Sequence, residues 1–156
     1  MVGIPLLFTI TEKVEGNGFM ADVTMRGRIL GVKEDGDVWM YGVQPGGIAA
    51  GGKDEGTAYL EFRQTLKTVL FDILIDSPDF RSFKREFKKF FEEVSRPNEV
   101  DWWEAVEEAR RGRIKVKGIP TVNADTEKPY LEVKKIQNPQ AKHNILEPYT
   151  MSAVAA

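Results

Sequence analysis

Hydrophobic and polar residues alternate along the first third of the chain, a pattern typical of antiparallel strands with one buried face. In residues 7–14 and 19–26 the larger apolar side chains share one parity within each segment, and residues 15–18 have turn composition. A four-residue turn there would place Val14 opposite Phe19. The pattern therefore predicts a half-buried antiparallel hairpin.

A second hairpin is predicted by Asp35-Gly36, which suits a two-residue type I′ turn. The apolar residues expected on its core face are Leu30, Val32, Trp39 and Tyr41. This set occupies even positions in the incoming strand, whereas the core set of the preceding segment occupies odd positions. Because a shift of one residue exchanges the faces of a strand, we expect a bulge or break near Arg26-Gly27.

The opposite face of this second hairpin is also apolar, with Ile29, Val38 and Met40. A meander followed by one long helix has only one face of its sheet covered. The three residues therefore need a later helix, the C-terminal segment or a partner protein to cover them. We name Ile29, Val38 and Met40 as candidate partner-binding residues. We also expect at least a homodimer, built on this face, on a sheet edge or on the C-terminal arm.

Three helices are expected after the strands. Apolar residues at helical spacing predict a long helix from its N-cap, Asp54, to about Ile75. Ser77 suits the N-cap of a second, phenylalanine-rich helix. Asn98 suits the N-cap of a third helix, which Gly112 would end.

The predicted fold class is α+β, with an antiparallel β-meander packed on a long helix, two further helices and a C-terminal strand or hairpin segment. The late strand candidates are residues 113–117 and 130–136. We expect a unit at 1–76, a helical extension packed on it at 77–117, and a strand-containing arm or tail at 118–156.

Composition narrows the function. The chain has 156 residues, which suits one domain or one domain with an appendage. With 22 basic and 24 acidic residues the net charge is −2, which gives no global attraction to nucleic acid or to an acidic membrane. The absence of cysteine excludes disulfides and thiolate chemistry, and it fits a cytoplasmic protein. No apolar run approaches the length of a membrane span.

Candidate catalytic chemistry is sparse. The single histidine, His143, lies in an irregular tail next to Lys142 and Asn144. Because a catalytic role needs a positioned acid-base group with partners, a solvated tail residue is favoured over a catalytic one. The acidic residues Glu34, Asp35 and Asp37 cluster at a hairpin turn, and turn chemistry explains them better than metal binding. We therefore predict no catalytic, cofactor-binding or metal-binding residues.

Basic residues line the polar side of the second predicted helix: Arg81, Lys84, Arg85, Lys88 and Lys89. Glu86, Glu92 and Glu93 dilute this charge, so a solvated helix face is favoured over a nucleic-acid site. We expect no tight nucleic-acid binding by the chain alone.

A local motif carries a family resemblance. Its parts are Pro45-Gly46, the apolar segment Ile48-Ala49-Ala50, Gly51-Gly52 before the capping Asp54, and Ala58 in the helix. With the order strand, strand, strand, short strand, helix, this arrangement resembles the HicB-type antitoxin fold over residues 4–75. Gly56-Thr57 stand where that family often has an acidic pair, and neither a helix-turn-helix nor a ribbon-helix-helix DNA-binding segment is found after Ile75. The resemblance implies a non-enzymatic module that dimerises and masks a small RNA-cleaving toxin.

The expected function is therefore a non-enzymatic protein that binds a small protein partner, as a HicB-like antitoxin or an orphan relative of one. Two alternatives stay open. One is a self-assembling structural or interaction protein of a phage or mobile element. The other is a metal-dependent nuclease whose metal site contains only carboxylates.

Overall fold

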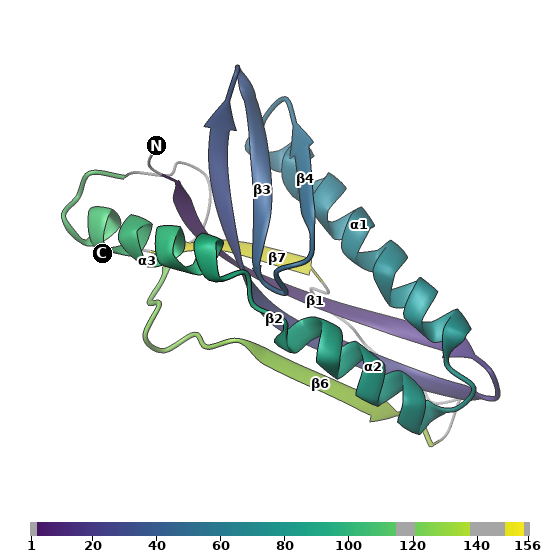
Figure 1. The fold of residues 1–156 in the computed structure, drawn as a ribbon. Helices are drawn as coiled ribbons and strands as arrows, with labels where there is room; N and C mark the ends of the chain where they lie inside the picture. The colour runs from purple at the N-terminus through teal and green to yellow at the C-terminus, as the bar shows by residue number, and fades with distance from the viewer. Residues whose placement is uncertain (1–2, 115–120, 138–148, 155–156) are drawn as a thin grey trace.

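The computed structural model describes residues 3–114, 121–137 and 149–154, and it has the predicted α+β class (Figure 1). One mixed sheet carries three helices. The elements are β1 (Ile4–Gly16), β2 (Phe19–Glu34), β3 (Asp37–Gln44), β4 (Ala49–Gly52), α1 (Glu55–Asp76), α2 (Phe80–Glu92), α3 (Arg96–Arg110), β5 (Thr121–Val122), β6 (Tyr130–Lys135) and β7 (Tyr149–Val154).

The long β1–β2 hairpin organises the sheet. The strand order is β4-β3-β2-β1-β7-β5, and β6 pairs with β2 beside this path. All pairs are antiparallel except β5 with β7. Along one edge, β2 pairs first with β6, over residues 21–26, and then with β3, over residues 28–34. The sheet therefore branches at this edge, and Figure 1 shows β3 and β4 diverging from β6 there.

Gly27 lies at the branch point, where the backbone is crowded. A Cβ added at Gly27 would lie 2.4 Å from the Gln44 carbonyl oxygen and 2.4 Å from the Phe8 ring. The pairing of β2 with β3 shifts register between Arg28 and Ile29, close to the predicted break. The predicted exchange of faces is wrong, because the odd-numbered residues of β2 from Phe19 to Ile29 all stay buried on one side.

Both hairpin turns have two residues with positive φ. Asn17 (φ 53°) and Gly18 (φ 85°) turn the first hairpin, so Phe19 pairs with Gly16. The predicted pairing of Phe19 with Val14 is therefore wrong by two residues. Because side chains alternate between faces with a period of two, this shift leaves the same residues on the buried face. The Asp35-Gly36 turn is confirmed, with φ of 52° and 85°.

The larger core lies between one face of the sheet and the helices α1 and α2. Its strands contribute apolar residues of one parity, and aromatic rings from the helices interleave with them. The Phe8 and Phe62 rings meet edge to face at 5.5 Å, and Phe19 lies 5.7 Å from Phe83. The fully or almost fully buried helical residues include Ala58, Phe62, Leu66, Leu70, Phe83 and Phe87.

A smaller core lies on the opposite face under α3. Leu7, Leu30 and Val43 pack there with Trp102 and Val106. Leu30 and Val32 thus face α3, not the long helix as the sequence suggested. Trp39 lies farther along this face and remains 37% exposed.

The helix ends depend on side-chain caps. Asp54 caps α1 as predicted, since its carboxylate accepts the Thr57 N–H at 2.7 Å, and this hydrogen bond lowers the pKa of Asp54. The N-cap of α2 is Asp79, which accepts the Ser82 N–H at 2.8 Å, so the prediction of Ser77 was wrong. The Ser77 hydroxyl instead donates to the last turn of α1.

The third helix begins earlier than expected. Ser95, not Asn98, is its N-cap, and Pro97 lies in its first turn. The backbone N–H of Ser95 donates to the Val43 carbonyl at 3.0 Å, and the Asn98 amide donates to the Gly42 carbonyl at 3.1 Å. These two bonds anchor the start of α3 to the end of β3. Gly112, with φ of 73°, follows the helix end as predicted.

The C-terminal strands complete the sheet. The strand expected at 130–136 is confirmed as β6, and β7 pairs with the outer edge of β1 over Leu6 to Ile10. The strand expected at 113–117 falls largely outside the described residues, as does His143. Among the helices that the structure describes, none has the length and apolar character needed to span a membrane.

Candidate functional site

The three predicted partner-binding residues are core residues. Ile29 and Met40 are 0% exposed and Val38 is 4% exposed. They pack in the larger core with residues of α1, because β2 does not exchange faces and α1 lies against β3 and β4. The prediction that this face lies beyond the reach of the long helix is wrong, and the three side chains are not accessible to a partner.

Two of the acidic residues at the second hairpin turn, Glu34 and Asp37, have structural partners. No group of three or more Asp, Glu, His or Cys residues that could hold a metal is found in residues 3–114, 121–137 and 149–154. At the hairpin tip, Glu34 accepts the Tyr41 hydroxyl at 3.1 Å, and Asp37 pairs with Lys53 at 3.3 Å. Burial, followed by the contact with Glu34, raises the pKa of Tyr41.

A partly buried cation lies beneath α3. The Arg28 guanidinium is 4.7 Å from the centre of the Trp102 ring and 5.2 Å from that of Trp103. Desolvation lowers the pKa of Arg28, and the charge of Glu99 partly opposes this shift. The Trp102 indole N–H donates to the Leu6 carbonyl at 3.3 Å. The cluster therefore fastens α3 to β1 and β2.

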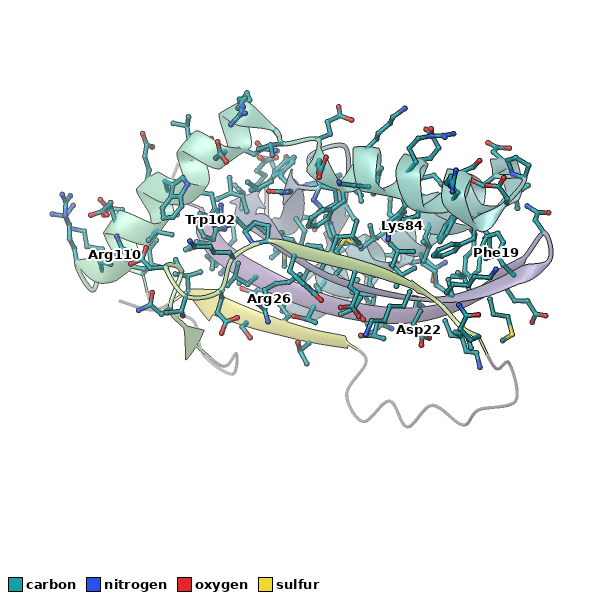
Figure 2. The ribbon with its side chains drawn as sticks, turned by 90° about the horizontal axis from the view of Figure 1, so that it is seen from below. Phe19, Asp22, Arg26, Lys84, Trp102 and Arg110 are labelled. Atoms are coloured by element: carbon teal, nitrogen blue, oxygen red, sulfur yellow. The ribbon has the colours of Figure 1, made fainter. Side chains whose placement is uncertain are left out.

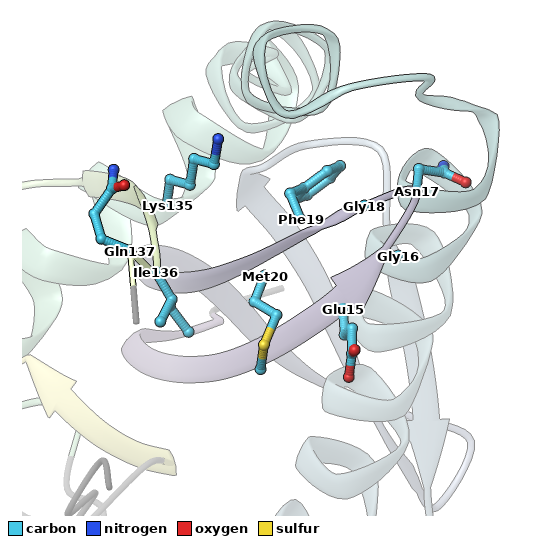
Figure 3. A pocket seen from close by; sticks show the side chains of 9 residues that line it. All are labelled: Glu15, Gly16, Asn17, Gly18, Phe19, Met20, Lys135, Ile136 and Gln137. Atoms are coloured by element: carbon cyan, nitrogen blue, oxygen red, sulfur yellow. The ribbon is translucent and has the colours of Figure 1, made fainter. Parts of the chain in front are cut away.

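A hollow of about 590 Å³ lies at the tip of the first hairpin (Figure 3). Among the described residues, 15–20 and 135–137 line it, and the charged ones are Glu15 and Lys135. Gln137 is the last described residue before 149, so the surroundings of the hollow on that side lie outside the described residues. We assign it no role.

A second groove lies between α2 and β6, and we call it the β6–α2 groove. Its volume is about 410 Å³. Its lining comes from three distant parts of the chain: Gln44, Lys84, Lys88, Phe91, Glu92, Pro129, Tyr130, Leu131 and Val133. The groove combines an apolar floor with a basic wall. The buried Phe91 and Val133 and the half-buried Leu131 form the floor.

Two lysines of α2 form the basic wall of the groove. Lys88 lies 3.9 Å from Glu92, but both side chains are about 60% exposed (63% and 59%), so water weakens this pair. Lys84 has no ion-pair partner among the described residues. Figure 2, seen from below, labels Lys84 on the side of α2 that overlooks β6. The wall is therefore available to an acidic ligand.

At the other end of the groove, Tyr130 is 45% exposed. Its hydroxyl donates to Glu132, which raises the pKa of Tyr130 and lowers that of Glu132. An exposed tyrosine with an oriented hydroxyl is a common anchor in protein interfaces.

Known proteins add no assignment. No family model matches the chain, and the searches of curated proteins and of solved structures returned no match.

The groove was not predicted from the sequence, although its parts were noticed. Lys84 and Lys88 were interpreted as a solvated helix face, and residues 130–136 as a strand. The missing information was that β6 pairs with β2 beneath α2, more than one hundred residues away along the chain. No local pattern encodes that pairing.

Proposed function

We propose that this chain is a non-enzymatic protein that binds a small protein partner in the β6–α2 groove. The observation that supports this most strongly is the coincidence of three features in one groove. These are an apolar floor, two accessible lysines and the outer edge of a strand that pairs only with β2 among the described strands. The cytoplasm is the proposed location, in keeping with the cysteine-free composition.

The resemblance to HicB-type antitoxins gives this proposal its particular form. The order of β1, β2, β3, β4 and α1, together with the Asp54 cap, supports a HicB-like antitoxin or an orphan relative. The partner would then be a small RNA-cleaving toxin.

Self-association through this groove is less well supported. Pairing of two β6 edges would bring together Lys84, Lys88 and Lys135 from both copies, and like charges at close range oppose such pairing. A homodimer formed elsewhere on the surface is compatible with the proposal.

Affinity purification from the native host tests the proposed function. We would compare the wild-type chain with Lys84→Glu/Lys88→Glu, which reverses the basic wall. The matched control is Lys13→Glu/Lys33→Glu, which makes the same charge change at two exposed lysines outside the groove. We expect one protein to copurify stoichiometrically with the wild type and the control, and to be lost from the groove variant. Equal recovery with the folded groove variant would contradict the proposal.

A further inference from the structure

We infer that the ligand of the β6–α2 groove is an acidic, extended peptide segment that adds as a strand to the outer edge of β6. This inference rests on the proposed function, because it specifies how the partner is held. It follows from the ladder geometry of β6, from the charge of α2 and from the branch in the sheet.

The ladder shows which backbone groups of β6 face outward. The Ile136 N–H donates to the Met20 carbonyl at 2.8 Å, and β6 continues in the same antiparallel register to Tyr130 opposite Arg26. In an antiparallel pair, hydrogen-bonded residues alternate with residues whose N–H and C=O point away from the partner strand. Even-numbered residues of β6 therefore bond to β2.

The odd-numbered residues Leu131, Val133 and Lys135 consequently direct their N–H and C=O groups to the outer edge. Among the described residues, no backbone group pairs with them there. The groove is lined by Tyr130 as well as Leu131 and Val133, so it contacts both even- and odd-numbered residues of β6. A ligand strand in the groove would satisfy these unpaired groups.

The charge around this edge selects the ligand. Side chains of an added strand alternate between two faces, so every second ligand residue would lie on the α2 side, beside Leu131 and Val133. Lys84 and Lys88 overlook that side, and Lys84 has no acidic partner in the described part of the chain. Glutamate or aspartate at those ligand positions would pair with them.

The branch in the sheet limits the length of ligand strand that β6 can bind. β3 and β6 occupy consecutive stretches of the same β2 edge, and Gln44 at the end of β3 lines the groove. The outer edge of β6 is therefore short, and Gln44 lies near its Tyr130 end. A nucleic acid fits this site less well, because Glu92 lies 3.9 Å from Lys88 and a phosphate backbone cannot complete a β-ladder.

Lysines near a strand edge also have a simpler explanation, since they discourage edge-to-edge aggregation. The two explanations differ in what charge reversal does. If the lysines only protect the edge, reversing their charge leaves peptide affinity unchanged. If the lysines select the ligand, reversing their charge changes the preference from acidic to basic peptides.

The test uses the full chain, labelled with ¹⁵N, and three probes: a decapeptide alternating glutamate and valine, one alternating lysine and valine, and a single-stranded oligonucleotide. In the free protein we expect the amides of Leu131 and Val133 to exchange quickly with solvent and those of Glu132 and Lys134 to exchange slowly. The glutamate peptide should slow exchange at Leu131 and Val133 at least tenfold. The lysine peptide and the oligonucleotide should not.

Charge reversal provides the second readout. Lys84→Glu/Lys88→Glu should weaken the affinity for the glutamate peptide by about tenfold or more and strengthen the affinity for the lysine peptide. Lys13→Glu/Lys33→Glu should leave the preference for the glutamate peptide unchanged. Three results would overturn the inference: protected odd-numbered amides in the free chain, unchanged peptide affinity in the groove variant, or preferential protection by the oligonucleotide. A partner that copurifies through the groove without alternating protection would spare the proposed function and remove only strand addition. If the peptide protects these amides but no native partner depends on the groove, strand addition would stand and the proposed function would be contradicted.

Discussion

Replacement of Met40 by alanine tests most directly the correction that the structure makes to the sheet faces. Met40 is 0% exposed and belongs to the core beneath α1, together with Ile29 and Val38. Truncating a fully buried methionine removes its transfer free energy and leaves a cavity, at a combined cost of about 2–5 kcal/mol. For a chain of this length, each kcal/mol lowers the melting temperature by roughly 2–4 °C. We therefore expect Met40→Ala to melt roughly 4–20 °C below the wild type.

Urea denaturation followed by circular dichroism gives the free energy of unfolding for this comparison. Lys33→Ala, an exposed change on the same hairpin, serves as the control and should stay within about 0.5 kcal/mol of the wild type. If Met40 were instead an exposed contact for a partner, its truncation would also cost less than about 0.5 kcal/mol in the isolated chain. That outcome would refute the assignment of this face to the core.

Three further outcomes are expected. Gly27→Ala should destabilise the chain in urea titrations, since its Cβ would meet backbone and ring atoms at 2.4 Å, whereas Gly47→Ala, with nothing within 4 Å, should not. Trp102→Ala should cost about 3–5 kcal/mol of unfolding free energy and detach α3, seen as faster amide exchange in that helix, while exchange in α1 should change less. Asp54 and Asp79 have pKa values lowered by cap hydrogen bonds, so the unfolded state binds more protons in the acid range, and stability should fall as pH drops through their folded pKa values. Replacing both aspartates by asparagine should flatten that acid limb; an unchanged limb would contradict the cap assignment.

Local signals in the sequence were sufficient for several elements. Asp35-Gly36 defined its turn because the two positive φ angles of a type I′ turn strongly favour these residue types. Asp54 defined the start of α1 because a carboxylate at the N-cap accepts a backbone N–H three residues on. In each case the deciding interaction spans only a few residues, so the sequence pattern carries it.

The misassigned face and the groove depend on contacts between distant segments. Helices cover both faces of β2 near its end, so apolar residues occur there at odd and even positions, as Ile29, Leu30 and Val32 show. Alternation of apolar and polar residues then cannot indicate which face packs against which helix. Similarly, neither Lys84 nor Leu131 indicates a site by itself. The groove exists because β6 pairs with residues 21–26, a pairing set by tertiary packing.

A photo-crosslinking residue in place of Tyr130, introduced in cells of the native host, tests the central claim most directly. Tyr130 lines the groove and is 45% exposed, whereas Gln64, on the exposed side of α1, is the matched control position. We predict a single major adduct from position 130, with the crosslink mapped by mass spectrometry to an acidic segment of one small protein, and no such adduct from position 64. Absence of an adduct at position 130, or the same adduct at both positions, would contradict a partner-binding role for the β6–α2 groove.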